Sequence, residues 1–214
     1  SINIGRLVPQ IVYYVYAYGK LLENGEIEEG EKINITVPTG NFGNILAAYF
    51  AKRMGLPVSR LICASNDNKV LYDFFQTGVY DRRREFILTT SPSMDILISS
   101  NLERLLYLAS DCDAKATGEL MRQLAENGFY EIDTAMKEKI ADFTGGFADQ
   151  EENAGEIRKV FRDTGYLMDT HTGVASSVYR RYREETGDQT KTVIASTASP
   201  YKFSRSVMEA ICDC

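Results

Sequence analysis

The chain has 214 residues, of which 44% are apolar and 25% are charged, and its net charge is −6 at pH 7. These proportions are typical of a globular chain that is long enough to bury a core. The negative charge excludes a nucleic-acid partner, since the one short basic run, Arg82–Arg84, has no interleaved aromatic residues. No apolar run approaches the roughly 18 residues of a membrane span, so we expect no membrane partner.

The cysteines and the two ends of the chain give further expectations. The cysteines have neither the pattern of a disulfide framework nor the spacing of zinc ligands, so we expect a cytoplasmic protein without a metal. They are Cys63, Cys112, Cys212 and Cys214. The chain becomes apolar almost at once after Ser1 and stops just after a helical pattern. We therefore expect a piece excised from a longer protein.

Strand and helix patterns alternate over the first part of the chain and again at its end. Gln10–Leu22 is expected to be a helix that begins near Pro9, and it is apolar on nearly every side, which is typical of a buried helix. Strands are expected at Ile33–Val37, Val58–Ala64, Glu85–Leu88, Tyr166–Met168 and Thr192–Ser196. Other helices are expected at Ile45–Met54, Asp67–Gln76 with Asn66 as its N-cap, and Thr172–Glu185. This alternation predicts an α/β fold with a mainly parallel sheet flanked by helices.

The middle of the chain has a different pattern. From Ser99 to Gly165 we find helical patterns and no strand signal; the expected helices are Leu102–Ala109, Lys115–Glu126, Thr134–Phe143 and Ala154–Arg162. We interpret this part as a helical insertion. The expected organisation is a first α/β part at 1–98, the insertion at 99–165, and a final α/β part at 166–214.

The most specific local pattern is Thr39-Gly40-Asn41-Phe42-Gly43-Asn44, which lies between an expected strand and an expected helix. Its two glycines allow the backbone to approach a ligand closely. The helix that follows points free N–H groups and the positive end of its dipole at the same place, which suits a phosphate. The pattern is neither a Walker A loop nor a dinucleotide G-x-G-x-x-G. An ordinary strand-to-helix turn is the alternative.

Three segments together carry a resemblance. Val37–Asn44 resembles the cofactor-phosphate loop of threonine synthases, which are fold-type-II pyridoxal-phosphate enzymes. Ser1-Ile2-Asn3-Ile4-Gly5-Arg6, with Gln10–Tyr14 after it, is similar to the family's Asn-Ser-Ile-Asn-x-x-Arg segment without its leading Asn. Ser196–Phe203 is similar to the family's Thr-Ala-His/Ser-Pro-x-Lys-Phe segment. The three occur in the family's order and cover the chain from end to end.

The resemblance implies a tryptophan-synthase-β-like fold and the cofactor pyridoxal 5'-phosphate. It implies a carbon–oxygen lyase that converts O-phosphohomoserine and water into threonine and phosphate, in threonine biosynthesis. The family's Schiff-base lysine stands in a Phe-Lys-Asp/Glu context that does not occur in this chain. We therefore expect no catalytic residue here, and a fragment that is inactive alone.

The resemblance also implies roles for individual residues. The cofactor would be bound by the loop residues Gly40, Asn41, Phe42, Gly43 and Asn44 and by Thr197, whose neutral hydroxyl would face the pyridine nitrogen. Arg6 and Asn44 would bind the substrate phosphate, for which a guanidinium is well shaped. Without the resemblance, Arg6 would be a surface ion pair and Thr197 part of a turn. His171 and Lys202 are left out of the expected site.

Other functions remain open. A serine/threonine dehydratase or a cysteate synthase would share the fold, but a dehydratase has no second phosphate for Arg6 to bind. A non-catalytic domain that binds a phosphorylated ligand would explain the missing lysine. The tyrosine-rich first helix makes a homo-oligomer possible.

Overall fold

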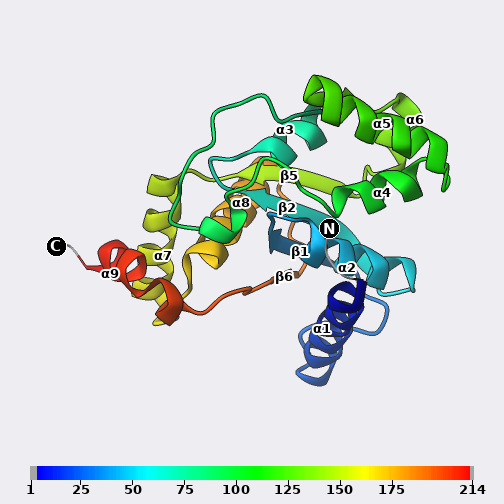
Figure 1. Ribbon diagram of the computed structural model, residues 1–214. Coiled ribbons are helices and arrows are strands. Elements are labelled where there is room, and N and C mark those ends of the chain that lie inside the picture. Colours follow the sequence, from blue (N-terminus) through cyan, green and yellow to red (C-terminus); the bar gives the residue numbers. More distant parts are fainter. Residues whose placement is uncertain (1–3, 213–214) are drawn as a thin grey trace.

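The computed structural model describes residues 4–212 and shows an α/β fold (Figure 1). Ser1–Asn3 of the first motif and Cys214 lie outside the described residues. A four-stranded sheet in the order β5-β2-β1-β6 forms the centre, and its neighbouring strands are all parallel. The strands are β1 (Ile33–Pro38), β2 (Val58–Ser65), β5 (Phe143–Phe147) and β6 (Thr192–Ile194). The expected α/β class with a mainly parallel sheet is confirmed.

Helices surround this sheet. They are α1 (Ile4–Glu23), α2 (Gly43–Arg53), α3 (Val70–Thr77), α4 (Leu102–Ala109), α5 (Ala114–Asn127), α6 (Thr134–Lys139), α7 (Gln150–Thr164), α8 (Thr170–Thr186) and α9 (Ser204–Ile211). The short elements are the antiparallel pair β3 (Val79–Asp81) and β4 (Phe129–Glu131) and the 3₁₀ turns η1 (Pro92–Met94) and η2 (Pro200–Phe203). Between residues 4 and 212, no helix combines the length and the apolar character needed to cross a membrane.

Different helices cover the two faces of the sheet, because side chains alternate along each strand. On β2, Leu61 and Cys63 belong to a buried cluster with residues of α2 and α3. Ile62 and Ala64 point the other way and pack against α8 through residues such as Val174. Beyond these layers, α7 packs on α8, α9 on α7, and α1 on α2 (Figure 1). The sheet is therefore flanked by helices on both faces, as expected.

The first helix differs from its expected form. It begins at Ile4, so Pro9 lies inside it. The expected burial is also wrong, because the fully buried residues are limited to Leu7, Tyr14 and Tyr18. Several other apolar side chains are 50–64% exposed: Ile4, Val8, Val12, Tyr13, Val15 and Tyr16. The sequence specifies a helix that is apolar all round, but the described residues cover only one side of it.

Two expected strands do not form. Glu85–Leu88 makes no ladder, because the Asn68 carboxamide takes the place of a neighbouring strand. It accepts from the Ile87 N–H at 3.0 Å and donates to the Ile87 carbonyl at 2.7 Å. Tyr166–Met168 is an irregular link between α7 and α8. A short apolar run therefore does not by itself identify a strand.

Asn66 does not cap the helix that follows it, which is a further correction. The N-cap position of α3 is Lys69, without a side-chain cap. The Asn66 side chain instead donates to Thr89, Ser91 and Asp95 at 2.7–3.0 Å. Asn66 thus fixes the loop that leads into η1 and does not start α3.

The segment from Ser99 to Gly165 is not helical throughout. It contains β4, which pairs with β3, and β5, which forms an edge of the main sheet. The helix expected at Thr134–Phe143 ends at Lys139, and β5 follows it. The division of the chain at 98/99 and at 165/166 stays a prediction.

The glycines of β5 explain why this strand escaped detection. Glycine has low β-propensity, so Phe-Thr-Gly-Gly-Phe does not look like a strand. A Cβ on Gly145 would lie 3.1 Å from the Tyr72 Cα of α3, and one on Gly146 would lie 2.4 Å from a Val178 methyl of α8. Both positions therefore need glycine because helices approach the sheet closely from both sides.

Candidate functional site

The strand order brings two of the expected site segments together. β1 and β6 are neighbouring parallel strands with Thr36 opposite Ile194, and the Ala195 N–H donates to the Thr36 carbonyl at 2.9 Å. Because the strands run in the same direction, the segments that follow them leave at the same edge of the sheet. The loop at Thr39–Phe42 and the segment that contains Thr197 therefore meet at this carboxyl edge.

Phe42 sets the shape of the loop between β1 and α2. Its backbone is left-handed, with φ 62° and ψ 5°, which costs a non-glycine residue about 1–2 kcal/mol. Burial offsets this cost, because the ring is fully buried between Phe75 and Phe143, with centroid distances of 6.0 and 5.6 Å. A left-handed residue next to a helical one turns successive N–H groups to the same side, an arrangement that binds anions.

The Thr39 N–H donates to the Ala64 carbonyl at 2.8 Å, but beyond Thr39 the loop uses its carbonyl groups and not its N–H groups. The carbonyl oxygens of residues 40–42 accept, in order, from Ser99 Oγ at 2.7 Å, Asn101 Nδ2 at 2.8 Å and the Leu46 N–H at 3.1 Å. The backbone N–H groups of residues 40–45 donate to no atom among the described residues. Unused N–H groups at the N-terminus of a helix are donors suited to an anion.

One face of α1 forms a second wall. Arg6, Gln10 and Tyr14 follow one another at intervals of four residues and so share a face of the helix. Arg6 is exposed, and the buried Gln10 Oε1 has no hydrogen-bond partner among the described residues. The Tyr14 hydroxyl donates to Asn44 Oδ1 in the first turn of α2. A buried acceptor without a donor is costly, so Gln10 Oε1 marks a position that a ligand or a water molecule could satisfy.

His171 supports the site from the other side. The Ser93 N–H donates to His171 Nε2 at 3.3 Å, and His171 Nδ1 lies 3.0 Å from Asp169 Oδ1. Burial would raise the pKa of Asp169, but hydrogen bonds from His171 and Thr172 outweigh burial and lower it. The carboxylate therefore keeps the Nδ1–H tautomer of His171, which leaves Nε2 as the acceptor for Ser93. His171 is a buried structural residue that ties η1 to α8.

A cavity of about 470 Å³ lies between these walls. Its lining contains every site residue expected from the sequence: Arg6, Gly40, Asn41, Phe42, Gly43, Asn44 and Thr197. It also contains residues that were not in the expected site: Gln10, Ser93, Met94, His171 and Lys202. The four-residue spacing from Arg6 could have identified Gln10, whereas Ser93 and Met94 belong to no recognisable pattern.

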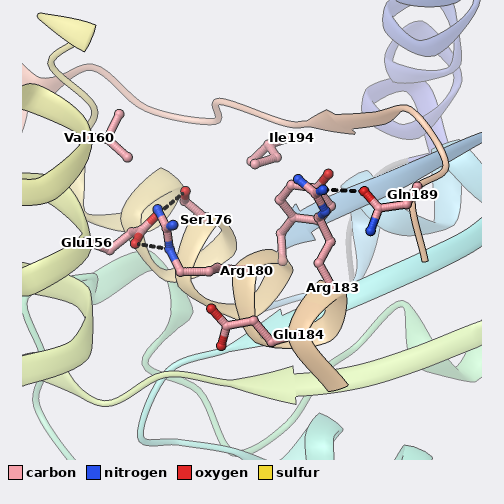
Figure 2. A pocket seen from close by; sticks show the side chains of 9 residues that line it. Glu156, Val160, Ser176, Arg180, Arg183, Glu184, Gln189 and Ile194 are labelled. Carbon is pink, nitrogen blue, oxygen red and sulfur yellow. Dashed lines mark hydrogen bonds and ion pairs between the residues drawn. The ribbon is translucent and has the colours of Figure 1, made fainter. Parts of the chain in front are cut away.

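A second cavity of about 470 Å³ lies between α7, α8 and β6 (Figure 2). Five of its polar side chains are already hydrogen-bonded within the lining. Arg180 makes two hydrogen bonds of 2.8 Å to Glu156, Ser176 Oγ donates to Glu156 at 2.6 Å, and Arg183 donates to Gln189 (Figure 2). Because these groups are mutually satisfied, the cavity beside the loop is the stronger candidate for a functional site.

The sequence is similar to those of threonine synthases and threonine synthase-like proteins. The family described as "Threonine synthase, C-terminal" matches residues 172–213. Threonine synthase-like 1 of Homo sapiens is 44% identical over 99% of this chain, which spans 28% of that relative.

Two solved structures are similar to the whole chain. The PLP-bound threonine synthase of Brucella melitensis has 41% identity and a TM-score of 0.90, with 98% of this chain and 44% of that chain covered. The yeast threonine synthase has 35% identity and a TM-score of 0.92, with 100% and 44% covered. The parallel sheet flanked by helices thus matches the fold-type-II PLP enzymes. This chain spans less than half the length of these relatives. The chain belongs to the threonine synthase family.

Proposed function

We propose that this chain provides the phosphate-binding part of a threonine synthase active site. The observation that carries the proposal is the set of unused N–H groups of residues 40–45, which line a cavity together with Arg6 and Thr197. A phosphate dianion accepts hydrogen bonds without donating any, so this set of donors fits the phosphate of pyridoxal 5'-phosphate. The carbonyl groups of the loop, which would repel an anion, are bonded elsewhere.

Each wall of the cavity would have its own part in converting O-phosphohomoserine and water into threonine and phosphate. When bound, pyridoxal phosphate supplies an electron sink for this chemistry. The residues Gly40–Asn44 would hold the cofactor phosphate. Thr197 would offer a neutral hydroxyl to the pyridine nitrogen and so add no charge there. Arg6, together with the Asn44 side chain, would hold the substrate phosphate as it leaves.

The chain alone would not complete the reaction. It contains no lysine in a Phe-Lys-Asp/Glu context, and this kind of covalent catalysis depends on that amine. The lysines already present, including Lys202 at the cavity, are not proposed as replacements. The chain would therefore bind cofactor and substrate without turning the substrate over.

Equilibrium dialysis of the purified chain tests the binding proposal. Pyridoxal phosphate should be retained, whereas pyridoxal, which lacks the phosphate, should not. With O-phosphohomoserine added, phosphate release should not exceed that of a cofactor-only control. Equal retention of both compounds would remove the basis for the phosphate site, and turnover that survives repurification would contradict the inactivity.

A non-catalytic domain that binds a phosphorylated ligand is the second candidate, because the unused N–H groups of residues 40–45 suit any phosphate group. The cofactor-loaded chain distinguishes the two. A threonine synthase site should bind O-phosphohomoserine in preference both to serine or threonine, which have no phosphate for Arg6, and to inorganic phosphate, which has no amino-acid part. A phosphate-binding domain of another kind should show no preference for the amino-acid part of the molecule.

A further inference from the structure

We propose that Tyr14 is a positioning residue for the phosphate site, an inference that rests on the proposed function. Its hydroxyl holds the Asn44 carboxamide in one orientation, with Oδ1 turned towards α1 and the Nδ2 hydrogens available to the cavity. Asn44 then presents only donors to a bound molecule. The site consequently selects groups that accept hydrogen bonds on all sides, as a phosphate dianion does.

The contact joins two helices that are far apart in sequence. Tyr14 belongs to the face of α1 that also carries Arg6 and Gln10, and its side chain is buried where α1 packs on α2. Asn44, thirty residues later, lies in the first turn of α2 and lines the cavity. The hydrogen bond therefore links the substrate-facing side of α1 to the end of the helix that holds the loop.

The chemistry of the two groups fixes the direction of this bond. Burial raises the pKa of Tyr14 far above its ordinary value, so the phenol keeps its proton. A buried O–H needs an acceptor, and the Tyr14 hydroxyl donates to Asn44 Oδ1. With the carboxamide flipped, Nδ2 would face the phenol and the tyrosine proton would lose its acceptor. The observed orientation gives the phenol its acceptor and leaves Nδ2 for a ligand.

The effect on binding depends on whether the groups that face the ligand are hydrogen-bond donors or acceptors. A freely rotating carboxamide would turn its oxygen towards a bound phosphate for part of the time, and two acceptors repel. Held by Tyr14, the Asn44 side chain offers its two N–H donors, together with Arg6, to the substrate phosphate, beside the backbone N–H groups of residues 40–45 that would hold the cofactor phosphate. One hydroxyl in the packing interface thus strengthens the preference of the cavity for an anion.

A double-mutant cycle with inorganic phosphate as the probe tests this role. Tyr14→Phe removes one oxygen from an intact interface and should weaken phosphate binding about 3- to 10-fold. In an Asn44→Ala background, the same change should have no further effect, because Tyr14 acts through Asn44. Tyr13→Phe and Tyr16→Phe are matched controls on the same helix, since both side chains are mostly exposed, and they should leave the affinity unchanged. Equal losses in both backgrounds, or no loss at all, would overturn the proposal.

The side-chain NH₂ signal of Asn44 in a ¹⁵N spectrum, assigned by its loss in Asn44→Ala, gives a readout without ligand. Tyr14→Phe should shift this signal and speed the exchange of its two protons, whereas the two control variants should not. If the wild-type chain binds no phosphate, the proposed function fails and the positioning role is judged by this signal. A moved signal would then support the orientation of Asn44, and an unmoved one would refute it.

Discussion

A methyl group on Gly40 would lie 2.6 Å from the carbonyl oxygen of Ser93. The phosphate loop therefore rests directly on the backbone of η1, and no side chain can be inserted between them. Ser93 is held in turn by His171, which is bonded to the buried Asp169. The position of the loop thus depends on a series of contacts that ends in α8, on the opposite face of the sheet.

Gly40→Ala should disrupt the loop. Because the obstructing atom belongs to the backbone, either the loop or η1 must move, at a cost of about 1–3 kcal/mol in the free energy of unfolding. Phosphate affinity should fall about tenfold or more, since the N–H groups lose their common direction. Gly118→Ala in α5 is the matched control, because a Cβ there meets nothing within 4 Å; it should be neutral or gain up to about 1 kcal/mol. Unchanged phosphate binding in Gly40→Ala, measured by calorimetric titration, would contradict the role of the loop.

Arg6→Ala should impair substrate binding without affecting the cofactor. A hydrogen bond to a charged group contributes about 1.5–3 kcal/mol, so the affinity of the cofactor-loaded chain for O-phosphohomoserine should fall roughly 10- to 150-fold. Arg6→Lys restores the charge but not the two-pronged geometry and should recover part of the loss. Retention of pyridoxal phosphate should stay at the wild-type level. If Arg6→Ala loses affinity for both cofactor and substrate, Arg6 is a structural residue. Arg122→Ala, on the surface of α5, serves as the control.

Asp169→Asn should change the pH dependence of stability. The pKa of Asp169 is lowered in the folded state, so its carboxylate stabilises the fold above its ordinary value of 3.8 and loses this effect as the pH falls through the lower folded-state value. The variant should therefore be about 1–3 kcal/mol less stable at neutral pH, and the difference should shrink in acid. Asp113→Asn is the control, because Asp113 caps the exposed start of α5, where Asn is equally effective. Denaturant unfolding across the acid range measures both, and a constant difference would contradict the assignment.

Gly146→Ala should destabilise the sheet by about 1–3 kcal/mol, because the new methyl group would lie 2.4 Å from a methyl group of Val178. Val178→Ala removes the obstruction, so the double variant should lose less stability than the sum of the two single variants. Gly155→Ala in α7 meets nothing within 4 Å and should be neutral or stabilising. If the two single-variant losses of stability, measured by thermal unfolding, are additive in the double variant, then Val178 of α8 does not contact Gly146 of β5.

The exposed apolar side of α1 predicts self-association. Val12 and Tyr16 are 62% and 64% exposed, and apolar patches of this kind commonly form interfaces. Sedimentation velocity should show a concentration-dependent species that Val12→Glu abolishes. Ala125→Glu adds the same charge on α5, where no such patch is expected, and should have no effect. A single monomeric species at all concentrations would contradict this prediction.

The sequence by itself determined the local features of this protein. The strand–loop–helix unit around Gly40–Asn44 could be predicted because glycine conformation, helix capping and strand alternation act over a few residues. Those signals predicted β1, β2 and α2, and with them the parallel α/β class. The resemblance carried by the segments at Arg6 and Thr197 added the candidate site, whose individual roles stay predictions.

Only the tertiary structure decided the features that depend on distant neighbours. Gly145 and Gly146 belong to a strand because α3 and α8 approach that strand closely, and no local pattern records this approach. Tyr14 contacts Asn44 because α1 packs on α2. The exposed residues of α1 were expected to be buried, because the apolar character of a helix does not reveal which of its sides is covered. The strand order also places the loop after β1 beside Thr197. Parallel strands pair through hydrogen bonds whatever their separation along the chain, so a local pattern could not predict this.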